Sequence, residues 1–495
     1  MSSTEILVKY RNKNTVETIK LKPNESVSKK IEELNDNPAV DYAEPNYLYE
    51  ASLIPSDTYY GEQWYLDKIQ APKSWDIARD ASDIVIAVID SGVQINHPDL
   101  KDNIWVNEDE IPNNNIDDDR NGFIDDVNGW DFVNNTASPE PKFKPDFTEA
   151  GILHGTIVSG IAAAIGNNKS GVAGIAWKAK IMPLKVLDDA GEGNTGNVVK
   201  SIDYAIANGA DIINLSFVGF GFSYSLEASI KRAYDAGLII AAAAGNEQGE
   251  GSGYSLDDTP MYPACHDGKN GENMVIGVAA TDTLDQKAIF SSHGFKCVDI
   301  AAPGTSIFST LVYSPKHNTP DKVFDKYYGG YWSGTSMATP MVSAAAALIR
   351  SANPALGRDE ILNILFNNSD NINKLNPNYL NQLGKGRLNI YSSVSAAEKL
   401  LLNKKTSLIS SLQSDSFGVI KIMDKDGNVE KQISVFKNDF KGGINISSGD
   451  INGDGFSEII ASASGGSEPE VKVLDENGTV LKQFFAYNKN FRGGV

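Results

Sequence analysis

Asp90, His154 and Ser336 have the side-chain types of a group that orients a base, a base and a nucleophile. Ser336 lies in the octapeptide 333–340, which directly precedes the apolar, alanine-rich run 341–349. This run predicts a buried helix with the Ser336 hydroxyl exposed at its N-terminal end. Free N–H groups and the positive end of the helix dipole favour a developing negative charge there. Taken alone, Ser336 would more often cap a helix and His154 would more often be structural. Together the three fit hydrolysis by a serine nucleophile.

The surroundings of these residues predict where each would lie. Asp90 ends the β-branched run 84–89, a pattern typical of a strand buried on both faces, so its carboxylate would lie at the carboxyl edge of a parallel sheet. His154 opens a run of small residues that predicts a second buried helix. Asn246 follows the apolar run 241–245, and its amide could project into the same cleft as an oxyanion donor. Taken alone, Asn246 would be a turn residue.

These motifs resemble those of the subtilisin family of serine proteases. The resemblance rests on the octapeptide 333–340 and on the segments around the other three residues, and it covers about residues 54–403. It looks most like the thermitase-like branch and implies a serine endopeptidase that hydrolyses peptide bonds through an acyl-enzyme. The roles it implies are attack by Ser336, proton transfer by His154, orientation of the imidazole by Asp90 and oxyanion binding by Asn246. The alternative is an inactive subtilase-derived protein that binds surfaces or acts in adhesion.

The resemblance also implies a substrate cleft. Two extended segments would flank the substrate and one apolar side chain would form the pocket floor, and these residues are Gly191, Glu192, Gly193, Ser216, Phe217, Val218 and Met261. The family usually has Gly where Val218 stands, and a side chain there would narrow the pocket beside the scissile bond. We therefore expect protein or peptide substrates, broad specificity and a shallow, largely apolar primary pocket.

Calcium is the cofactor that the resemblance implies. The ligands of the tight family site would be the side chains of Asp57, Asp99 and Asn168 and the carbonyl groups of Ile165, Ser170 and Val172. An all-oxygen set of this kind suits Ca²⁺, although singly each residue would be read as part of a turn. A second family site near Asp131 lacks two of its carboxylates, because Asn134 and Thr136 stand in their places.

An acidic insertion offers a further candidate calcium loop. Its spacing resembles the start of a calcium-binding loop without the closing bidentate acid, and the residues are Asp117, Asp119, Asn121 and Asp125. A solvated acidic loop without an ion is an equal alternative.

Apolar runs predict the elements that must position these residues. Five such runs alternate with helical segments, which predicts an α/β domain with a mostly parallel sheet and helices on both faces, as in subtilisin-like folds. Residues 1–53 are typical of a small α+β unit, and its last strand resembles that of a subtilase prodomain, shortened here, whose tail would lie in the substrate cleft. The peptidase domain would span residues 54–403.

Residues 404–495 contain an internal repeat. The segment 420–428 matches 471–479 at an offset of 51 residues, which suits a propeller blade and predicts an incomplete all-β repeat region. The second copy stops within its module, so we expect a fragment of a longer protein. Between the copies lies a segment similar to the calcium loops of integrin-type propeller repeats, with candidate ligands Asp450, Asn452, Asp454 and Glu458.

Composition narrows the class of protein. Among 495 residues, 44 Lys and Arg stand against 64 Asp and Glu, a net charge of −20, so binding to nucleic acid or to an anionic membrane is not expected. No apolar run is long enough to span a membrane, and the start of the chain lacks a secretory signal. We expect a secreted or cell-surface monomer, with export inferred from the family.

The chain has two cysteines, Cys265 and Cys297. In subtilisin-like folds the loops that carry them approach each other around a weak cation site, and Cys297 stands where that site has an acidic ligand. The resemblance therefore implies a Cys265–Cys297 disulfide in place of the weak site. Two buried free thiols are the alternative.

Overall fold

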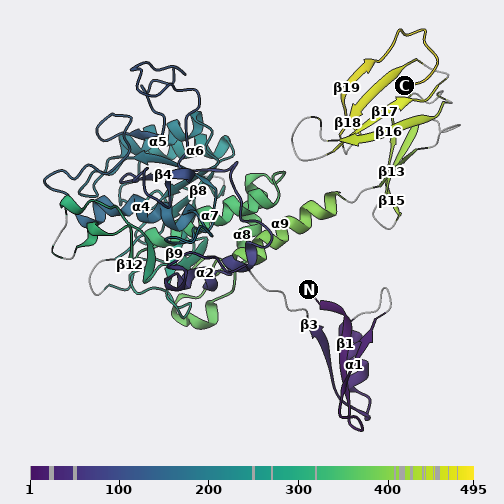
Figure 1. Cartoon of the computed structure of the whole chain (residues 1–495), viewed down its shortest axis with the longest axis horizontal. Helices are drawn as coiled ribbons and strands as arrows, with labels where there is room; N and C mark the ends of the chain where they lie inside the picture. The colour runs from purple at the N-terminus through teal and green to yellow at the C-terminus, as the bar shows by residue number, and fades with distance from the viewer. Residues whose placement is uncertain are drawn as a thin grey trace. The chain divides into compact units, whose positions relative to one another are not determined.

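The computed structural model divides the chain into two compact units, Met1–Leu53 and Ile54–Val495 (Figure 1). The described residues are 2–21, 27–47, 53–247, 251–268, 271–317, 320, 322–405, 408–411, 418–423, 427–436, 440, 442–449, 451, 457–465, 468–475 and 478–495. Two expected features lie outside them, namely the end of the prodomain tail at 48–52 and most of the C-terminal calcium loop.

The N-terminal unit is the small α+β fold that its alternating strands predict. Its antiparallel strands run in the order β2 (Val16–Lys20), β1 (Ser2–Tyr10) and β3 (Val40–Tyr47). Helix α1 (Val27–Asn35) packs on β1 and β3. Ile6 and Val8 are two residues apart on β1 and so lie on the same face of the sheet, and both are fully buried in the core of this unit.

A seven-stranded parallel sheet lies at the centre of the second unit. Its strands are, in sheet order, β10 (Ile300–Pro303), β9 (Ile276–Thr281), β8 (Ile239–Ala243), β7 (Ile212–Leu215), β4 (Val85–Asp90), β6 (Lys180–Lys185) and β5 (Trp130–Asp131). Nearly every residue of these strands is buried, as a parallel sheet covered on both faces requires. Because β4, β7 and β8 are parallel neighbours, Asp90, Ser216 and Asn246 come to the same edge of the sheet.

Helices cover both faces of this sheet, as Figure 1 shows. On one face α7 (Thr335–Ala352) packs on β7 to β10 and beside α4 (Glu149–Ala163). Its residues from Thr335 to Ile349 are all buried, which its small alanine side chains allow. On the other face α5 (Thr195–Ala207) and α6 (Tyr224–Asp235) share one hydrophobic cluster with the strands. The expected fold class is confirmed.

Further helices, a hairpin and short turns complete this body. They are α2 (Trp64–Lys68), α3 (Ala71–Ser74), α8 (Arg358–Asn367), α9 (Ile390–Lys405), the hairpin of β11 (Ile307–Thr310) and β12 (Tyr328–Trp332), and 3₁₀ turns at Tyr60–Glu62, Lys101–Asn103, Pro315–His317, Val323–Asp325, Asn373–Leu375 and Pro377–Tyr379. Across the described part of the chain, none of the helices has the length and apolarity needed to cross a membrane.

The C-terminal residues form two antiparallel sheets that share one hydrophobic core. Their strands are β13 (Leu408–Ser411), β14 (Val419–Met423) and β15 (Val429–Ser434), then β16 (Ile444–Gly449), β17 (Glu458–Ala463), β18 (Glu470–Leu474) and β19 (Val480–Phe485). The Ser411 hydroxyl donates to the Ile444 carbonyl at 2.8 Å, and the Ser462 hydroxyl, 51 residues on, donates to the Val495 carbonyl at 2.7 Å. Since both partners shift by the repeat length, β13–β15 correspond to β17–β19.

Candidate active site

The carboxyl edge of the sheet brings Asp90 and His154 into contact. Asp90 is the last residue of β4 and is fully buried, and its Oδ1 accepts hydrogen bonds from the Ser91 N–H at 2.7 Å and from His154 Nδ1 at 2.8 Å. Since an ionised carboxylate only accepts, His154 Nδ1 carries the proton and Nε2 keeps its lone pair. Ser336 is the second residue of α7 and is 9 % exposed.

The surroundings of His154 strengthen it as a base. Burial acts to lower its pKa, but the negative charge of Asp90 and the hydrogen bond to Asp90 outweigh burial, so the pKa of His154 is raised above its ordinary value. An imidazole tuned in this way accepts a proton more readily near neutral pH.

His154 lies inside α4, whereas the sequence predicted a helix that begins at His154. The helix begins at Glu149, because the Thr148 hydroxyl accepts a hydrogen bond from the Gly151 N–H at 2.9 Å and caps it. His154 therefore has helical residues before and after it and does not stand at the end of a helix.

Asn246 lies beside the N-terminus of α7. Its Oδ1 accepts hydrogen bonds from the Thr335 N–H at 2.9 Å and from the Thr335 hydroxyl at 3.1 Å, while Thr335 Oγ1 accepts from the Gly245 N–H at 3.1 Å. This leaves Nδ2 toward Gly334, where an added Cβ would stand 3.6 Å from it. The amide of Asn246 and the Ser336 N–H in the first turn of α7 are therefore two donors that lie beside the Ser336 side chain.

A buried polar chain ties Ser336 to β7. Ser343 Oγ donates to Asn214 Oδ1 at 2.9 Å, Asn214 Nδ2 donates to Ser216 Oγ at 2.9 Å, and Ser216 Oγ donates to the Ser336 carbonyl at 3.0 Å. Sequence reasoning missed both Asn214 and Thr335 as supporting residues. The available signal for Asn214 was a polar residue within an otherwise apolar strand.

The two expected cleft walls, Gly191–Gly193 and Ser216–Val218, rest on one core. Leu187, which forms a β-bridge with Gly193, and Phe217 both pack on the hydrophobic cluster shared with α5. Gly191 has a φ of 89°, which favours glycine, and all three residues of this wall are exposed. An exposed extended backbone of this kind can pair with an extended peptide.

The expected pocket floor is apolar and tightly packed. Val218 packs on the cluster that contains Met261, which is 1 % exposed. An added Cβ at Gly245 would meet Met261 Sδ at 2.2 Å, so Met261 lies directly against the residue that precedes Asn246. Gly219 and Tyr262 exchange two backbone hydrogen bonds of 2.8 Å, which join the wall to the floor.

Models of known families match three parts of the chain. The subtilase family matches residues 81–386. The chain belongs to this family. The fervidolysin N-terminal prodomain matches residues 4–46 and the FG-GAP repeat matches residues 442–481, in agreement with the expected prodomain and repeat region.

Relatives of this subtilase are serine proteases. Thermitase of Thermoactinomyces vulgaris is 35% identical over 341 residues, which cover 69% of this chain and 99% of thermitase. The thermophilic serine proteinase of Bacillus sp. (strain AK1) is 35% identical over 368 residues, which cover 74% of this chain and 75% of that protein. A solved protease structure from Pseudoalteromonas arctica PAMC 21717 matches with a TM-score of 0.53 and 29% identity, over 69% of this chain and 99% of that one. The expected serine endopeptidase is confirmed.

The residues expected to form the tight calcium site of the subtilase come together. Asp99 is fully buried, and its carboxylate accepts hydrogen bonds from Asn168 Nδ2 at 2.6 Å and from the Val172 N–H at 2.9 Å. The Ile165 N–H donates to the Asp99 carbonyl at 2.9 Å, and the Ser170 N–H donates to Asn168 Oδ1 at 2.8 Å. The turn that supplies the expected carbonyl ligands is thus folded around Asp99.

The chemistry of this site fits a cation. Asp57 is 5 % exposed, and its Oδ1 is buried without a hydrogen-bond partner in the described part of the chain. Burial, with a contribution from the charge of Asp57, raises the pKa of Asp99 to about 6 against the hydrogen bonds that lower it. Two buried carboxylates that repel each other and keep a free oxygen suit a bound Ca²⁺.

The acidic insertion gathers a different set of carboxylates from the expected one. Oxygens of Glu110, Asp119 and Asp126 all lie within 4.8 Å of one another, and Glu110 and Asp126 are buried. Asn121 Nδ2 donates to Asp119 at 2.9 Å and to Asp126 at 3.0 Å. The sequence pattern lacked a closing acid, and Glu110, which lies upstream of the loop, brings a third carboxylate to this cluster.

Asp117 and Asp125, which were expected as ligands, instead hold the backbone of the insertion. The carboxylate of Asp117 accepts from the N–H groups of Asn121 and Gly122, and the carboxylate of Asp125 accepts from those of residues 114 and 115. Each of these four hydrogen bonds is between 2.9 and 3.1 Å long. The carboxylate of Glu110 likewise accepts from the N–H groups of Asp118 at 2.7 Å and of Asp125 at 3.0 Å, so carboxylates inside and outside the cluster hold this backbone.

Lysine side chains lie at the second family position around Asp131. Lys142 Nζ lies 2.8 Å from Asp131 Oδ2 and donates to Thr136 at 2.9 Å, and Lys144 Nζ donates to Asn134 Oδ1 at 2.8 Å. Ammonium groups thus stand where the family would place a metal ion.

The C-terminal calcium loop is described only at its end. Its expected ligands Asp450, Asn452 and Asp454 lie outside the described residues. Glu458 is 3 % exposed and accepts a hydrogen bond from the Ile451 N–H at 2.7 Å.

Cys265 and Cys297 form a disulfide with a Cα–Cα distance of 4.9 Å. Both residues belong to the apolar cluster that Val218 and Met261 share. The bond therefore joins the loop after the pocket floor to the segment that leads into β10.

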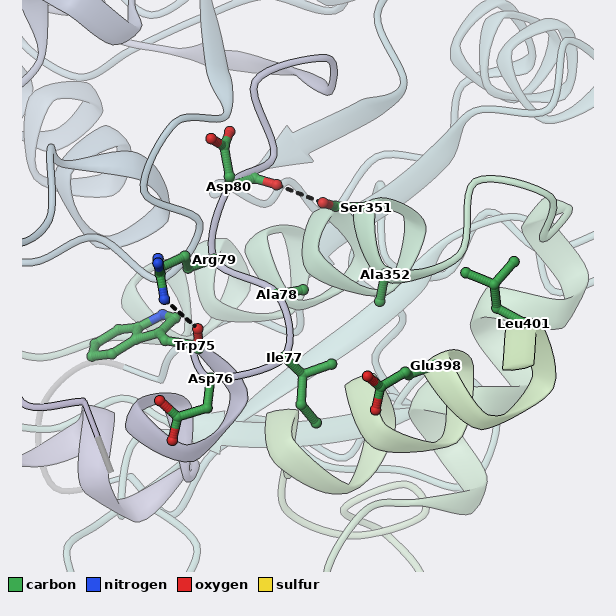
Figure 2. A pocket seen from close by; sticks show the side chains of 10 residues that line it. All are labelled: Trp75, Asp76, Ile77, Ala78, Arg79, Asp80, Ser351, Ala352, Glu398 and Leu401. Carbon is green, nitrogen blue, oxygen red and sulfur yellow. Dashed lines mark hydrogen bonds between the residues drawn. The ribbon is translucent and has the colours of Figure 1, made fainter. Parts of the chain in front are cut away.

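A cavity of about 460 Å³ lies at the end of α7 opposite to Ser336 (Figure 2). Its lining consists of Trp75, Asp76, Ile77, Ala78, Arg79, Asp80, Ser351, Ala352, Glu398 and Leu401. The Ser351 hydroxyl donates to the Asp80 carbonyl at 2.5 Å across its mouth. Since Ser336 is in the first turn of α7 and Ser351 in the last, this cavity is separate from the catalytic edge.

Proposed function

We propose that this subtilase is an exported, calcium-stabilised endopeptidase of broad specificity that uses Asp90, His154, Ser336 and Asn246. The observation that carries the proposal is the 2.8 Å contact between His154 Nδ1 and a buried Asp90. The helix that carries His154 packs beside α7, whose first turn holds Ser336 next to Asn246. Each part needed for acyl transfer has one residue of matching chemistry at this edge.

The reaction follows from these positions. Ser336 Oγ attacks the scissile carbonyl while His154 Nε2 takes its proton, and the negative charge of Asp90 stabilises the resulting imidazolium. Negative charge that develops on the carbonyl oxygen is met by Asn246 Nδ2 and the Ser336 N–H. His154 then protonates the leaving amine, and water attacks the acyl-enzyme by the same route.

The substrate would bind as an extended strand between Gly191–Gly193 and Ser216–Val218, which pair with its backbone. Its side chain before the scissile bond would enter the pocket above Met261. Val218 narrows this pocket, so small and medium apolar side chains should be preferred over large aromatic ones.

Calcium would be held chiefly at the tight site. The carboxylates of Asp57 and Asp99 would supply the negative charge, and cation binding would replace the hydrogen bond between Asn168 Nδ2 and Asp99. The acidic cluster of Glu110, Asp119 and Asp126 is a second candidate, and the loop 450–458 is a third. In each place the ion would stabilise the fold and take no part in bond cleavage.

The domain arrangement suggests a zymogen. Residues 1–53 would act as a prodomain whose tail occupies the cleft, residues 54–403 as the peptidase and residues 404–495 as part of a propeller-type repeat region. Export to the medium or the cell surface agrees with the acidic composition, and we expect a monomer.

Active-site labelling tests the proposal. A fluorophosphonate probe should label the purified chain at Ser336, and Ser336→Ala should abolish both labelling and peptide hydrolysis. The matched control is Ser351→Ala, which removes a serine from the last turn of the same helix, where it lines the separate cavity. Hydrolysis that survives Ser336→Ala would refute the assignment, and an unlabelled, inactive wild type would favour a binding or adhesive protein.

A further inference from the structure

Lys287 is a buried lysine whose ammonium group lies among backbone carbonyl groups. The residue is 9 % exposed, and Nζ donates hydrogen bonds to the carbonyls of Ser252 at 2.6 Å, Ser291 at 2.8 Å, Ala288 at 3.0 Å and Ile289 at 3.1 Å. An ammonium group has three N–H donors, so the four oxygens share them. Carbonyl oxygens that converge on one positive charge in this way are the usual surroundings of a bound metal cation.

Two contacts from the segment 376–379 fix this lysine further. Its backbone N–H donates to Asn376 Oδ1 at 2.7 Å, and Nζ lies 4.8 Å from the ring centroid of Tyr379. A cation over an aromatic ring is favourable, and more so when it is desolvated. These contacts hold the ammonium group of Lys287 in one position, unlike the ammonium group of an exposed lysine.

The turn of residues 288–291, which contacts Lys287, pairs through its backbone with residues 245–247, called here the oxyanion segment because it contains Asn246. Asn246 forms an antiparallel bridge with Ser291, and on either side the Glu247 N–H donates to the Phe290 carbonyl at 2.9 Å and the Ser292 N–H donates to the Gly245 carbonyl at 2.9 Å. Three of the four carbonyls around Lys287 Nζ belong to residues 288–291 of this turn. Its shape therefore sets the position of the Asn246 backbone.

We propose that Lys287 is a positioning residue for catalysis, whose ammonium group acts as a built-in cation that shapes the 288–291 turn and so aims Asn246 Nδ2 at the oxyanion. The inference rests on the role proposed for Asn246. Thr335 fixes the amide of Asn246 from the side of α7, and the turn fixes its backbone from the other side.

Because the proposed role of Lys287 needs its positive charge, kcat should depend on the pH at which Lys287 loses that charge. Burial lowers its pKa to about 8, against the charge of Glu247, which raises it. The other titratable groups that face it are His293 and the phenol of Tyr379, with Asp257 and Asp258 acting on His293. A neutral amine has two N–H donors and no charge, so four carbonyls would be left poorly satisfied and the turn would relax.

A double-mutant cycle tests the inference. Lys287→Met, Asn246→Ala and the double variant would be compared by kcat and KM on a chromogenic peptide, with active sites counted by fluorophosphonate titration. If Lys287 acts through Asn246, Lys287→Met should lower kcat by about tenfold or more with KM little changed, yet by less than about twofold when Asn246 is already Ala. Independent, additive effects on kcat would overturn the inference.

The cycle also separates this inference from the proposed function. An Asn246→Ala variant with unchanged kcat would refute the oxyanion role itself, whereas an additive cycle with an impaired Asn246→Ala would refute only the link to Lys287. The matched control is Lys472→Met, because Lys472 Nζ also donates to a carbonyl, at 2.9 Å, and lies 5.4 Å from an aromatic ring, but in the C-terminal repeats. That variant should leave kcat unchanged.

A charge-preserving variant covers the case in which Lys287→Met does not fold. Lys287→Arg keeps a cation whose charge persists to high pH. We expect wild-type kcat to fall as the pH rises through about 8 and the fall to move to higher pH in Lys287→Arg. A folded Lys287→Arg with the wild-type alkaline profile would overturn the inference.

Discussion

At the scale of single residues, the site depends on groups that hold the catalytic groups in place. Asp90 fixes the proton on His154 Nδ1, and Thr335 fixes the amide of Asn246 so that Nδ2 lies toward Gly334, close to Ser336. Preorganised donors of this kind contribute most where charge develops, because they need no rearrangement during the reaction.

The acid limb of activity should report the environment of His154. Protonation of Nε2 removes the base, so kcat/KM should fall as the pH drops through the pKa of His154. Because Asp90 raises that pKa, the midpoint should lie above the ordinary imidazole value of about 6.5. A pH profile of kcat/KM on a neutral peptide would measure it, and a midpoint clearly below that value would contradict the assigned contact.

Residue types and spacing were enough to propose the catalytic groups, but not the residues that hydrogen-bond to them. Asp90, His154, Ser336 and Asn246 stand in short motifs whose chemistry is readable along the chain. Thr335 and Asn214 act through contacts across many residues of sequence, which no local pattern encodes. Glu110 and Asp126 were missed for the same reason, because the fold of the insertion brings a carboxylate from before the loop into the cluster.

At the scale of elements, runs of apolar residues predicted the strands of the central sheet well, because parallel strands that are buried on both faces need continuous apolar sequence. Element boundaries were less predictable, as the start of α4 shows. A hydroxyl outside the apolar run caps that helix, so the pattern of buried residues begins later than the helix does.

The turn around Asp99 should depend on calcium. Binding at a site formed only in the native state adds about 4 kcal/mol to the free energy of unfolding at a thousandfold excess over Kd. Chelation should therefore lower the melting temperature, and Asp99→Ala should remove most of that difference. Asp102→Ala, in the neighbouring turn, serves as the control. Equal responses to calcium in wild type and Asp99→Ala would exclude this site.

The disulfide should stabilise the elements under the pocket. Closing a loop with a sequence separation of 32 residues contributes about 3–4 kcal/mol in the chain-entropy model. The double variant Cys265→Ser and Cys297→Ser should lower the free energy of unfolding by that order, measured by denaturant titration. Reduction of the wild type should have a similar effect, and no effect on the Ser variant. A wild type that unfolds identically with and without reductant would contradict a stabilising bond.

At the scale of the whole molecule, the family matches place a prodomain before the peptidase and a repeat after it. If the prodomain is removed by the enzyme itself, cleavage should fall between about residues 49 and 56, so that Asp57 stays with the peptidase. Mass spectrometry of the wild type and of Ser336→Ala, which should remain uncut, would map the new N-terminus. An N-terminus beyond Asp57 would contradict either the calcium ligand or the cleavage model.

Two conditions of the medium, the calcium concentration and the pH, should act on different parts of this enzyme. A metal ion leaves its site when the medium is diluted or a chelator is added, whereas the ammonium groups of Lys142 and Lys287 are tethered to the chain and keep the same local concentration in any medium. Water poor in calcium should therefore loosen the Asp99 turn and spare the oxyanion segment. Alkali should do the opposite, because loss of a proton removes the charge of Lys287 while its side chain stays in place.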